Sequence, residues 1–183
     1  MSRLLDFYRG EAADSEGRFL ADVLAWDDDA LEWAHDWVQW LFPLPEPSRF
    51  NRDAPLPTEE DMAAFRSDLF LRANLLKSFE RFLAFLGLQM TADGQVVEGG
   101  NLAARIGDVW AFPNHNWMRI SRVLRSLNLL GLAAEGRSLY EGLVALHRRR
   151  RFPLTLDTFQ HWTEAVERLP PRPPWERGGR EWR

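Results

Sequence analysis

Two aromatic-rich blocks constrain the fold of this chain more than any other feature. The first, His35 to Pro47, reads HDWVQWLFPLPEP, and the second, which starts eighty residues later at His115 and ends at Leu132, reads HNWMRISRVLRSLNLLGL. In both blocks Trp and aliphatic residues recur at helical spacing among a few polar groups, a pattern typical of helices that bury one face. The chain is therefore expected to pack around the helices that carry these blocks.

Capping residues predict further helices. Thr58 precedes three acidic residues, and Asp61 stands where a capping box needs an acceptor. Asp68 is expected to cap the next helix, which Gly87 should end. Short apolar segments lie at residues 4–8 and 19–26, and more helices are predicted over residues 27–41, 101–110, 114–130, 135–149 and 155–169.

These patterns predict an all-α fold, an irregular or orthogonal bundle of about six to eight helices. Residues 91–100 contain three glycines and are expected to form a loop or a small β excursion. A length of 183 residues favours one domain. We assign this helical domain to residues 1–169 and a Pro/Arg/Trp-rich flexible tail to residues 170–183.

The absence of cysteine excludes disulfide scaffolds, thiolate metal sites and thiol nucleophiles. No signal peptide is visible, and no apolar stretch approaches the roughly 20 residues that a membrane span needs. The expected protein is soluble and cytoplasmic. The single lysine against 22 arginines is typical of a GC-rich, bacterial genome.

Charge is distributed unevenly. Residues 1–61 hold 15 acidic and 5 basic side chains, whereas residues 62–183 hold 12 acidic and 18 basic ones. Either the two halves attract each other within one fold, or the basic half presents a surface to an anionic partner.

The order of several motifs resembles the conserved region of opioid growth factor receptors over about residues 7–165. The motifs are FYRGE at residues 7–11, VQWLFPL at residues 38–44 and the whole second block. The resemblance implies a mostly helical, non-enzymatic domain. In animals the family is linked to binding an enkephalin-type peptide and to restraining cell proliferation in a nuclear or perinuclear setting. It supplies no catalytic residues.

The first block contains the first candidate contacts. On one predicted helix, His35 shares a face with Glu32 and Gln39, which suits either internal packing or ligand binding. Trp37 and Trp40 continue a Trp stripe that begins at residue 33. Such a stripe forms core, or else an aromatic pocket for a peptide or cation.

The second block begins with polar residues that cap a helix or form a site for an anion, namely Asn114, His115 and Asn116. Arg119, Arg122 and Arg125 follow at three-residue spacing on one face. These arginines either pair with the acidic half or form a face for an acidic peptide or a phosphate-bearing molecule.

Two other patterns are weaker. The run of four arginines at residues 148–151 is interpreted as a solvated helix end, with nucleic-acid contact as the alternative. His161 and Glu164 form an HxxE spacing, which by itself is a weak metal signal. No nucleophile elbow, phosphate loop or HExxH motif is present.

The sequence therefore predicts a non-enzymatic domain that binds a ligand or protein, with no cofactor and no metal. The partner is an unknown peptide or protein, with an acidic one as an option, and the oligomeric state is left open. A nucleic-acid- or phosphate-binding protein that uses the Arg-rich face is the alternative, followed by an uncharacterised enzyme. The candidate contact residues are His35, Trp37, Gln39, Trp40, Asn114, His115, Asn116, Arg119 and Arg122.

Overall fold

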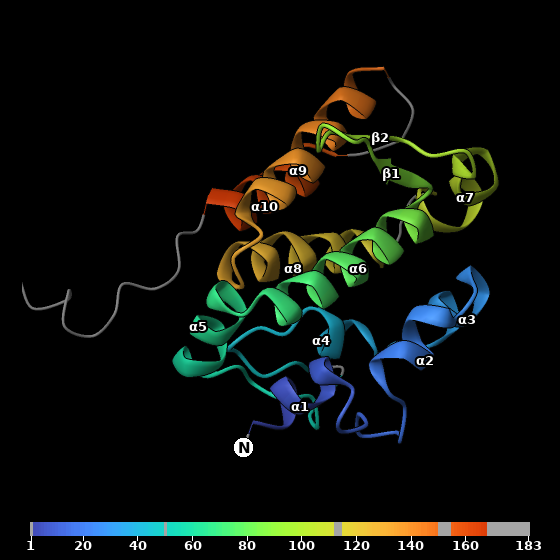
Figure 1. Cartoon of the computed structure of the whole chain (residues 1–183). Helices are drawn as coiled ribbons and strands as arrows, with labels where there is room; N and C mark the ends of the chain where they lie inside the picture. The colour runs from blue at the N-terminus through green and yellow to red at the C-terminus, as the bar shows by residue number, and fades with distance from the viewer. Residues whose placement is uncertain (1, 50, 112–114, 150–154, 168–183) are drawn as a thin grey trace, which may run out of the picture.

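The computed structural model describes residues 2–49, 51–111, 115–149 and 155–167, and these form ten helices and one small hairpin (Figure 1). This arrangement confirms the predicted all-α class. The helices are α1 (Arg3–Arg9), α2 (Leu20–Ala25), α3 (Asp28–Trp33), α4 (Val38–Leu41), α5 (Glu59–Ser67), α6 (Leu69–Leu86), α7 (Leu102–Val109), α8 (Asn116–Leu129), α9 (Ala133–Arg148) and α10 (Leu156–Glu167). The strands β1 (Leu88–Met90) and β2 (Val96–Glu98) pair antiparallel, with Leu88 opposite Glu98.

The described residues hold more helices than the six to eight expected. Both short apolar segments near the N-terminus are helical, as α1 and α2. The single helix predicted over residues 27–41 is wrong, because the chain forms α3 and α4 with an extended residue, Ala34, after α3. The strand β2 lies within the range predicted for a loop or small β excursion, residues 91–100, whereas the whole of β1 lies before that range.

The capping residues predicted for α5 and α6 are confirmed. Thr58 accepts a hydrogen bond from the backbone N–H of Asp61 (3.1 Å), and the Asp61 carboxylate accepts one from the N–H of Thr58 (2.9 Å). Asp68 accepts from the N–H of Phe70 (2.8 Å), and Gly87 ends α6 in the left-handed conformation. Asn101 precedes α7 without forming a side-chain capping bond, because its side chain donates to the carbonyl of Ala84 near the end of α6.

The long helix α6 runs through the middle of the molecule (Figure 1). Helices α1, α2 and α5 pack against it, and β1 lies at its C-terminal end. Helix α8 packs against both α9 and α10. The buried apolar side chains form one cluster that extends from Leu4 to Ala165, so the described elements share a single core.

Two further predictions concern the C-terminal tail and the absence of a membrane span. The tail predicted at residues 170–183 lies outside the described residues. Among the helices that the structure describes, none is both long and apolar enough to cross a membrane.

Candidate ligand-binding cleft

A cleft of about 770 Å³ lies where the two aromatic-rich blocks meet. Residues 35–49 form one wall, α8 forms another, and α10 contributes a third. The cleft is lined by His35, Val38, Gln39, Leu44, Pro47, Ser48, Arg49, His115, Met118, Arg119, Ser121, Arg122, Arg125, His161, Glu164 and Ala165. Five of the nine predicted contacts are in this lining, namely His35, Gln39, His115, Arg119 and Arg122.

Arg119 explains why α3 ends before the first block. Its Nη1 donates to the carbonyl of Leu31 (3.2 Å) and its Nη2 to the carbonyl of Ala34 (3.0 Å). In a continuous helix these carbonyls would accept from backbone N–H groups four residues later. The guanidinium takes that place, so His35, Glu32 and Gln39 do not share the helix face that the spacing predicted.

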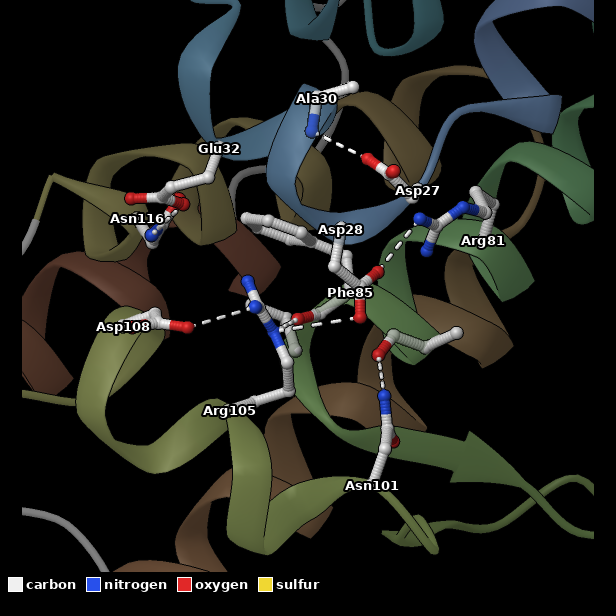
Figure 2. Close-up of polar contacts among 12 residues, drawn as sticks. Asp27, Asp28, Ala30, Glu32, Arg81, Phe85, Asn101, Arg105, Asp108 and Asn116 are labelled. Carbon is white, nitrogen blue, oxygen red and sulfur yellow. Dashed lines mark hydrogen bonds and ion pairs between the residues drawn. The ribbon is translucent and has the colours of Figure 1, made fainter.

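The start of α3 is fixed by a second set of contacts (Figure 2). Asp27 caps the helix by accepting from the N–H of Ala30 (2.8 Å). Asp28 accepts from Arg81 of α6 (2.7 Å) and lies 3.7 Å from Arg105 of α7. These pairs join the acidic N-terminal half to the basic half, which supports the interpretation that the two halves attract each other.

Two histidines from the two blocks stack at the cleft. The rings of His35 and His115 are 5.3 Å apart at an angle of 17°. His115 Nε2 lies 3.3 Å from a carboxylate oxygen of Glu32. Burial lowers the pKa of His115, and the charge of Arg119 acts in the same direction, while Glu32 opposes them. The neutral imidazole is therefore favoured here.

The three arginines of α8 have different partners. Arg119 is 6% exposed and, besides the two carbonyls, bonds Asn116 and lies 3.7 Å from Glu32. Arg125 pairs with Glu46. Arg122 donates only to the carbonyl of Phe42 (3.1 Å) and forms no ion pair with any residue that the structure describes.

Burial shifts the pKa of two of these arginines. It lowers the pKa of Arg122 to about 10, the neighbouring charge of Arg125 adds to that shift, and the charge of Glu46 opposes it. Burial likewise lowers the pKa of Arg119 to about 10, although Glu32 counteracts it. A partly buried cation that forms no close ion pair is unfavourable, so among the three α8 arginines Arg122 is the one that an added anion would stabilise most.

Gln39 contributes a buried side-chain oxygen that has no hydrogen-bond partner among the described residues. The side chain is 4% exposed, and its Nε2 donates over a long 3.4 Å to Ser48. Its Oε1 is buried and accepts no hydrogen bond in the described part of the chain. A buried acceptor of this kind is costly unless a donor reaches it. Apolar side chains of the lining, such as Leu44 and Met118, lie in the same cleft.

The predicted Trp contacts belong to the core instead. Trp37 is 1% exposed and donates from Nε1 to the carbonyl of Leu31 (2.9 Å), and Arg119 lies over its ring at 5.3 Å. Trp40 is fully buried, and neither ring lines the cleft. Trp33 is 85% exposed, because the break after α3 separates it from the other two. A direct ligand contact in this cleft is therefore unavailable to Trp37 and Trp40.

The polar residues before α8 also have separate positions. Asn114 lies outside the described residues. His115 precedes α8 without a side-chain capping bond. Asn116 is fully buried, donates to Glu32 (3.0 Å; Figure 2) and accepts from Arg119 (2.9 Å). Asn116 thus supports the cleft from behind and does not line it.

The α10 wall was not anticipated as part of the site. His161 and Glu164, whose spacing is by itself a weak metal signal, both line the cleft. The signal was their one-turn spacing, but only the packing of α10 on α8 shows what they face, including the bond from Trp162 Nε1 to the carbonyl of Trp117 (3.0 Å). In the arginine run, Arg149 lies 3.9 Å from Glu98, and Arg150 and Arg151 fall outside the described residues.

Comparison with known proteins identifies relatives over most of the chain. The family model described as "Opioid growth factor receptor (OGFr) conserved region" matches residues 2–146. Mouse opioid growth factor receptor is 37% identical over 134 residues, covering 70% of this chain and 21% of the relative. The human protein of that name is 36% identical over 135 residues, covering 70% and 20%.

A second group of relatives is more distant. Mouse opioid growth factor receptor-like protein 1 is 31% identical over 132 residues, covering 69% of this chain and 28% of the relative. The chain thus spans between about a fifth and three tenths of the length of these relatives. No solved structure matches. The family match ends at residue 146 and so includes two walls of the cleft but not α10.

Proposed function

The chain belongs to the family of the opioid growth factor receptor conserved region, and on that premise we propose that it is a non-enzymatic binding domain whose cleft holds an anionic ligand. The observation that carries this proposal is Arg122. It is a partly buried cation whose one hydrogen-bond partner in the described structure is the neutral carbonyl of Phe42, and it lines a cleft of ligand size.

The cleft has the mixed chemistry of a binding site. Four arginines line it together with apolar side chains that include Val38, Leu44 and Met118. Charge-assisted hydrogen bonds from a guanidinium to an oxyanion are among the stronger polar contacts in proteins. The ligand expected from this lining has an anionic group and an apolar part.

The names of the relatives agree with a binding role. Mouse and human relatives are named opioid growth factor receptors, and a receptor is a protein that binds a ligand. We carry over only this general property, because the chain spans about a fifth of their length.

The nucleic-acid alternative receives less support from the geometry. Arg119 is buried and Arg125 is paired with Glu46, so the α8 arginines do not form an open basic face. Nucleic-acid backbones are bound by arrays of exposed cations. A small anionic ligand fits the enclosed position of Arg122 better.

A fragment screen tests the proposal. ¹⁵N-labelled protein would be titrated with small carboxylates, phosphates, sulfonates and their neutral analogues, and amide shifts would be followed by NMR. We expect anionic fragments to shift amides of residues 38–49 and α8 in the wild type. Arg122→Gln should weaken their binding at least about tenfold, as the loss of a charge-assisted bond predicts.

Arg137→Gln is the matched control, since Arg137 is exposed on α9 and does not line the cleft. This variant should bind like the wild type. If no fragment binds in a manner that depends on Arg122, the proposed function is wrong.

A further inference from the structure

The charges around the cleft balance to a single excess positive charge. The lining contains four arginines, Arg49, Arg119, Arg122 and Arg125, and one carboxylate, Glu164. Two further carboxylates neutralise part of this set from outside the lining, since Glu32 lies 3.7 Å from Arg119 and Glu46 pairs with Arg125. Four cations therefore face three carboxylates, with the histidines counted as neutral.

A charge excess of one suits a monoanion better than a dianion. A phosphate monoester carries nearly two negative charges at neutral pH, and the second would exceed the single excess positive charge of this set. A carboxylate carries one charge, and its two oxygens match the planar donor pair of a guanidinium. Arg122 has such donors to spare, because only its Nη1 is engaged.

The unpartnered acceptor of Gln39 adds a second requirement. Its Oε1 accepts no hydrogen bond in the described structure, and its Nε2 bond to Ser48 is long at 3.4 Å. The terminal amide torsion of Gln is soft, so rotation about it can turn the oxygen toward a donor in the cleft that Gln39 lines. A ligand with an N–H group would satisfy this acceptor.

The two requirements meet in one chemical group. We propose that the cleft binds an N-acylated α-amino acid carboxylate, the group that also ends a peptide chain. Arg122 holds the carboxylate, Gln39 Oε1 accepts the adjacent N–H, and an apolar side chain lies against the walls that include Leu44 and Met118. This assignment rests on the proposed function and narrows it to a ligand class.

A series of five probes isolates each contact. N-acetyl-leucine carries all three features, N-acetyl-leucinamide lacks the charge, and 4-methylpentanoate lacks the N–H. 3-Methylbutyl phosphate replaces the carboxylate by a dianion, and N-acetyl-Gly-Gly-Leu tests whether a peptide terminus is accepted as well as a free acyl amino acid. Dissociation constants would be measured by NMR titration.

N-acetyl-leucine is expected to bind at least about tenfold more tightly than its amide, because the charge-assisted bond is lost. Removal of the N–H should weaken binding by about threefold to tenfold, as for a neutral hydrogen bond, and Gln39→Met should abolish that difference. Preserved amide shifts away from the cleft would show that Gln39→Met is folded. Tighter binding of the tripeptide than of N-acetyl-leucine would assign the peptide terminus as the source.

Glu164→Gln tests the charge balance directly. It raises the excess to two, so the affinity for the phosphate probe should increase more than the affinity for N-acetyl-leucine. Glu167→Gln, also on α10 but outside the lining, should change neither.

The carboxylate assignment would be overturned if the wild type bound N-acetyl-leucinamide as tightly as N-acetyl-leucine, or bound the phosphate probe more tightly than N-acetyl-leucine. If none of the probes binds but other anionic fragments still bind in a manner that depends on Arg122, the carboxylate assignment is wrong and the proposed function is retained. If no anion binds in a manner that depends on Arg122, both the carboxylate assignment and the proposed function are wrong.

Discussion

Arg119, on α8, donates a 3.0 Å hydrogen bond from Nη2 to the carbonyl of Ala34, the residue that directly follows α3. The partners are 85 residues apart in the chain. Through this bond the second aromatic-rich block determines where a helix before the first block stops. The same guanidinium lines the cleft, so the end of α3 and the shape of the cleft depend on one side chain.

Arg119→Gln should lower the free energy of unfolding by about 2–4 kcal/mol, because the carbonyls of Leu31 and Ala34 lose a charged donor in a buried site. Urea denaturation followed by circular dichroism measures the change. Arg125→Gln is the control on the same helix, and its partly exposed pair with Glu46 should contribute less than about 1 kcal/mol. Equal stability of the two variants would contradict the capping role.

Local signals were sufficient to predict most helix boundaries. Thr58 with Asp61, Asp68 and Gly87 act within a few residues of their own helix ends, and each was read correctly. The break after Ala34 was missed because its cause is a donor from α8. Asn101 shows the same limit, since its side chain bonds the carbonyl of Ala84, 17 residues away, and not a group of the helix that it precedes.

The site was predictable at the level of its two blocks but not of each contact. The blocks do meet, and Arg119 and Arg122 line the cleft between them. The Trp residues could not be assigned from spacing alone, because a stripe that serves a core and one that serves a pocket have the same period. The α10 wall depends on how α10 packs against α8, which no local pattern encodes.

Trp37 and Trp33 offer a matched test of that ambiguity. Trp37→Phe should lower the free energy of unfolding by about 1–3 kcal/mol, because it removes the bond to Leu31 and leaves space in a filled core. Trp33→Phe should change it by less than about 0.5 kcal/mol, since Trp33 is 85% exposed. Thermal and urea denaturation of both variants give the comparison. A larger effect at Trp33 would show that the stripe has a different burial from the one described.

Two glycines of α9 are expected to respond in opposite directions to alanine. At Gly142 a Cβ would lie 2.6 Å from the carbonyl oxygen of Val96 in β2, so Gly142→Ala should destabilise the protein by about 1–3 kcal/mol as the hairpin is pushed away. At Gly136 the nearest atom is 3.5 Å away, an ordinary contact, and the higher helix propensity of alanine should stabilise by about 0.5–1 kcal/mol. Urea denaturation of the pair measures both signs. A stabilising Gly142→Ala would show that β2 does not approach α9 so closely.

His115 should make the protein less stable in mild acid. Burial and Arg119 lower its pKa in the folded state, whereas the unfolded chain takes up the proton near pH 6.5. Between these two pKa values the unfolded state binds more protons, so the free energy of unfolding falls as the pH drops below about 6.5. The effect should stay below about 1 kcal/mol, because the ring is partly exposed.

NMR titration of the ring proton on Cε1 of His115 measures the folded-state pKa directly. Glu32→Gln removes the one neighbouring charge that favours the imidazolium, so the pKa of His115 should fall further in this variant. His115→Gln should flatten the dependence of stability on pH between about 7.5 and 5.5, and His161→Gln, which leaves His115 in place, should retain it. A pKa of His115 above 6.5 in the wild type would mean that the attraction of Glu32 outweighs burial and Arg119, and stability would then increase in mild acid.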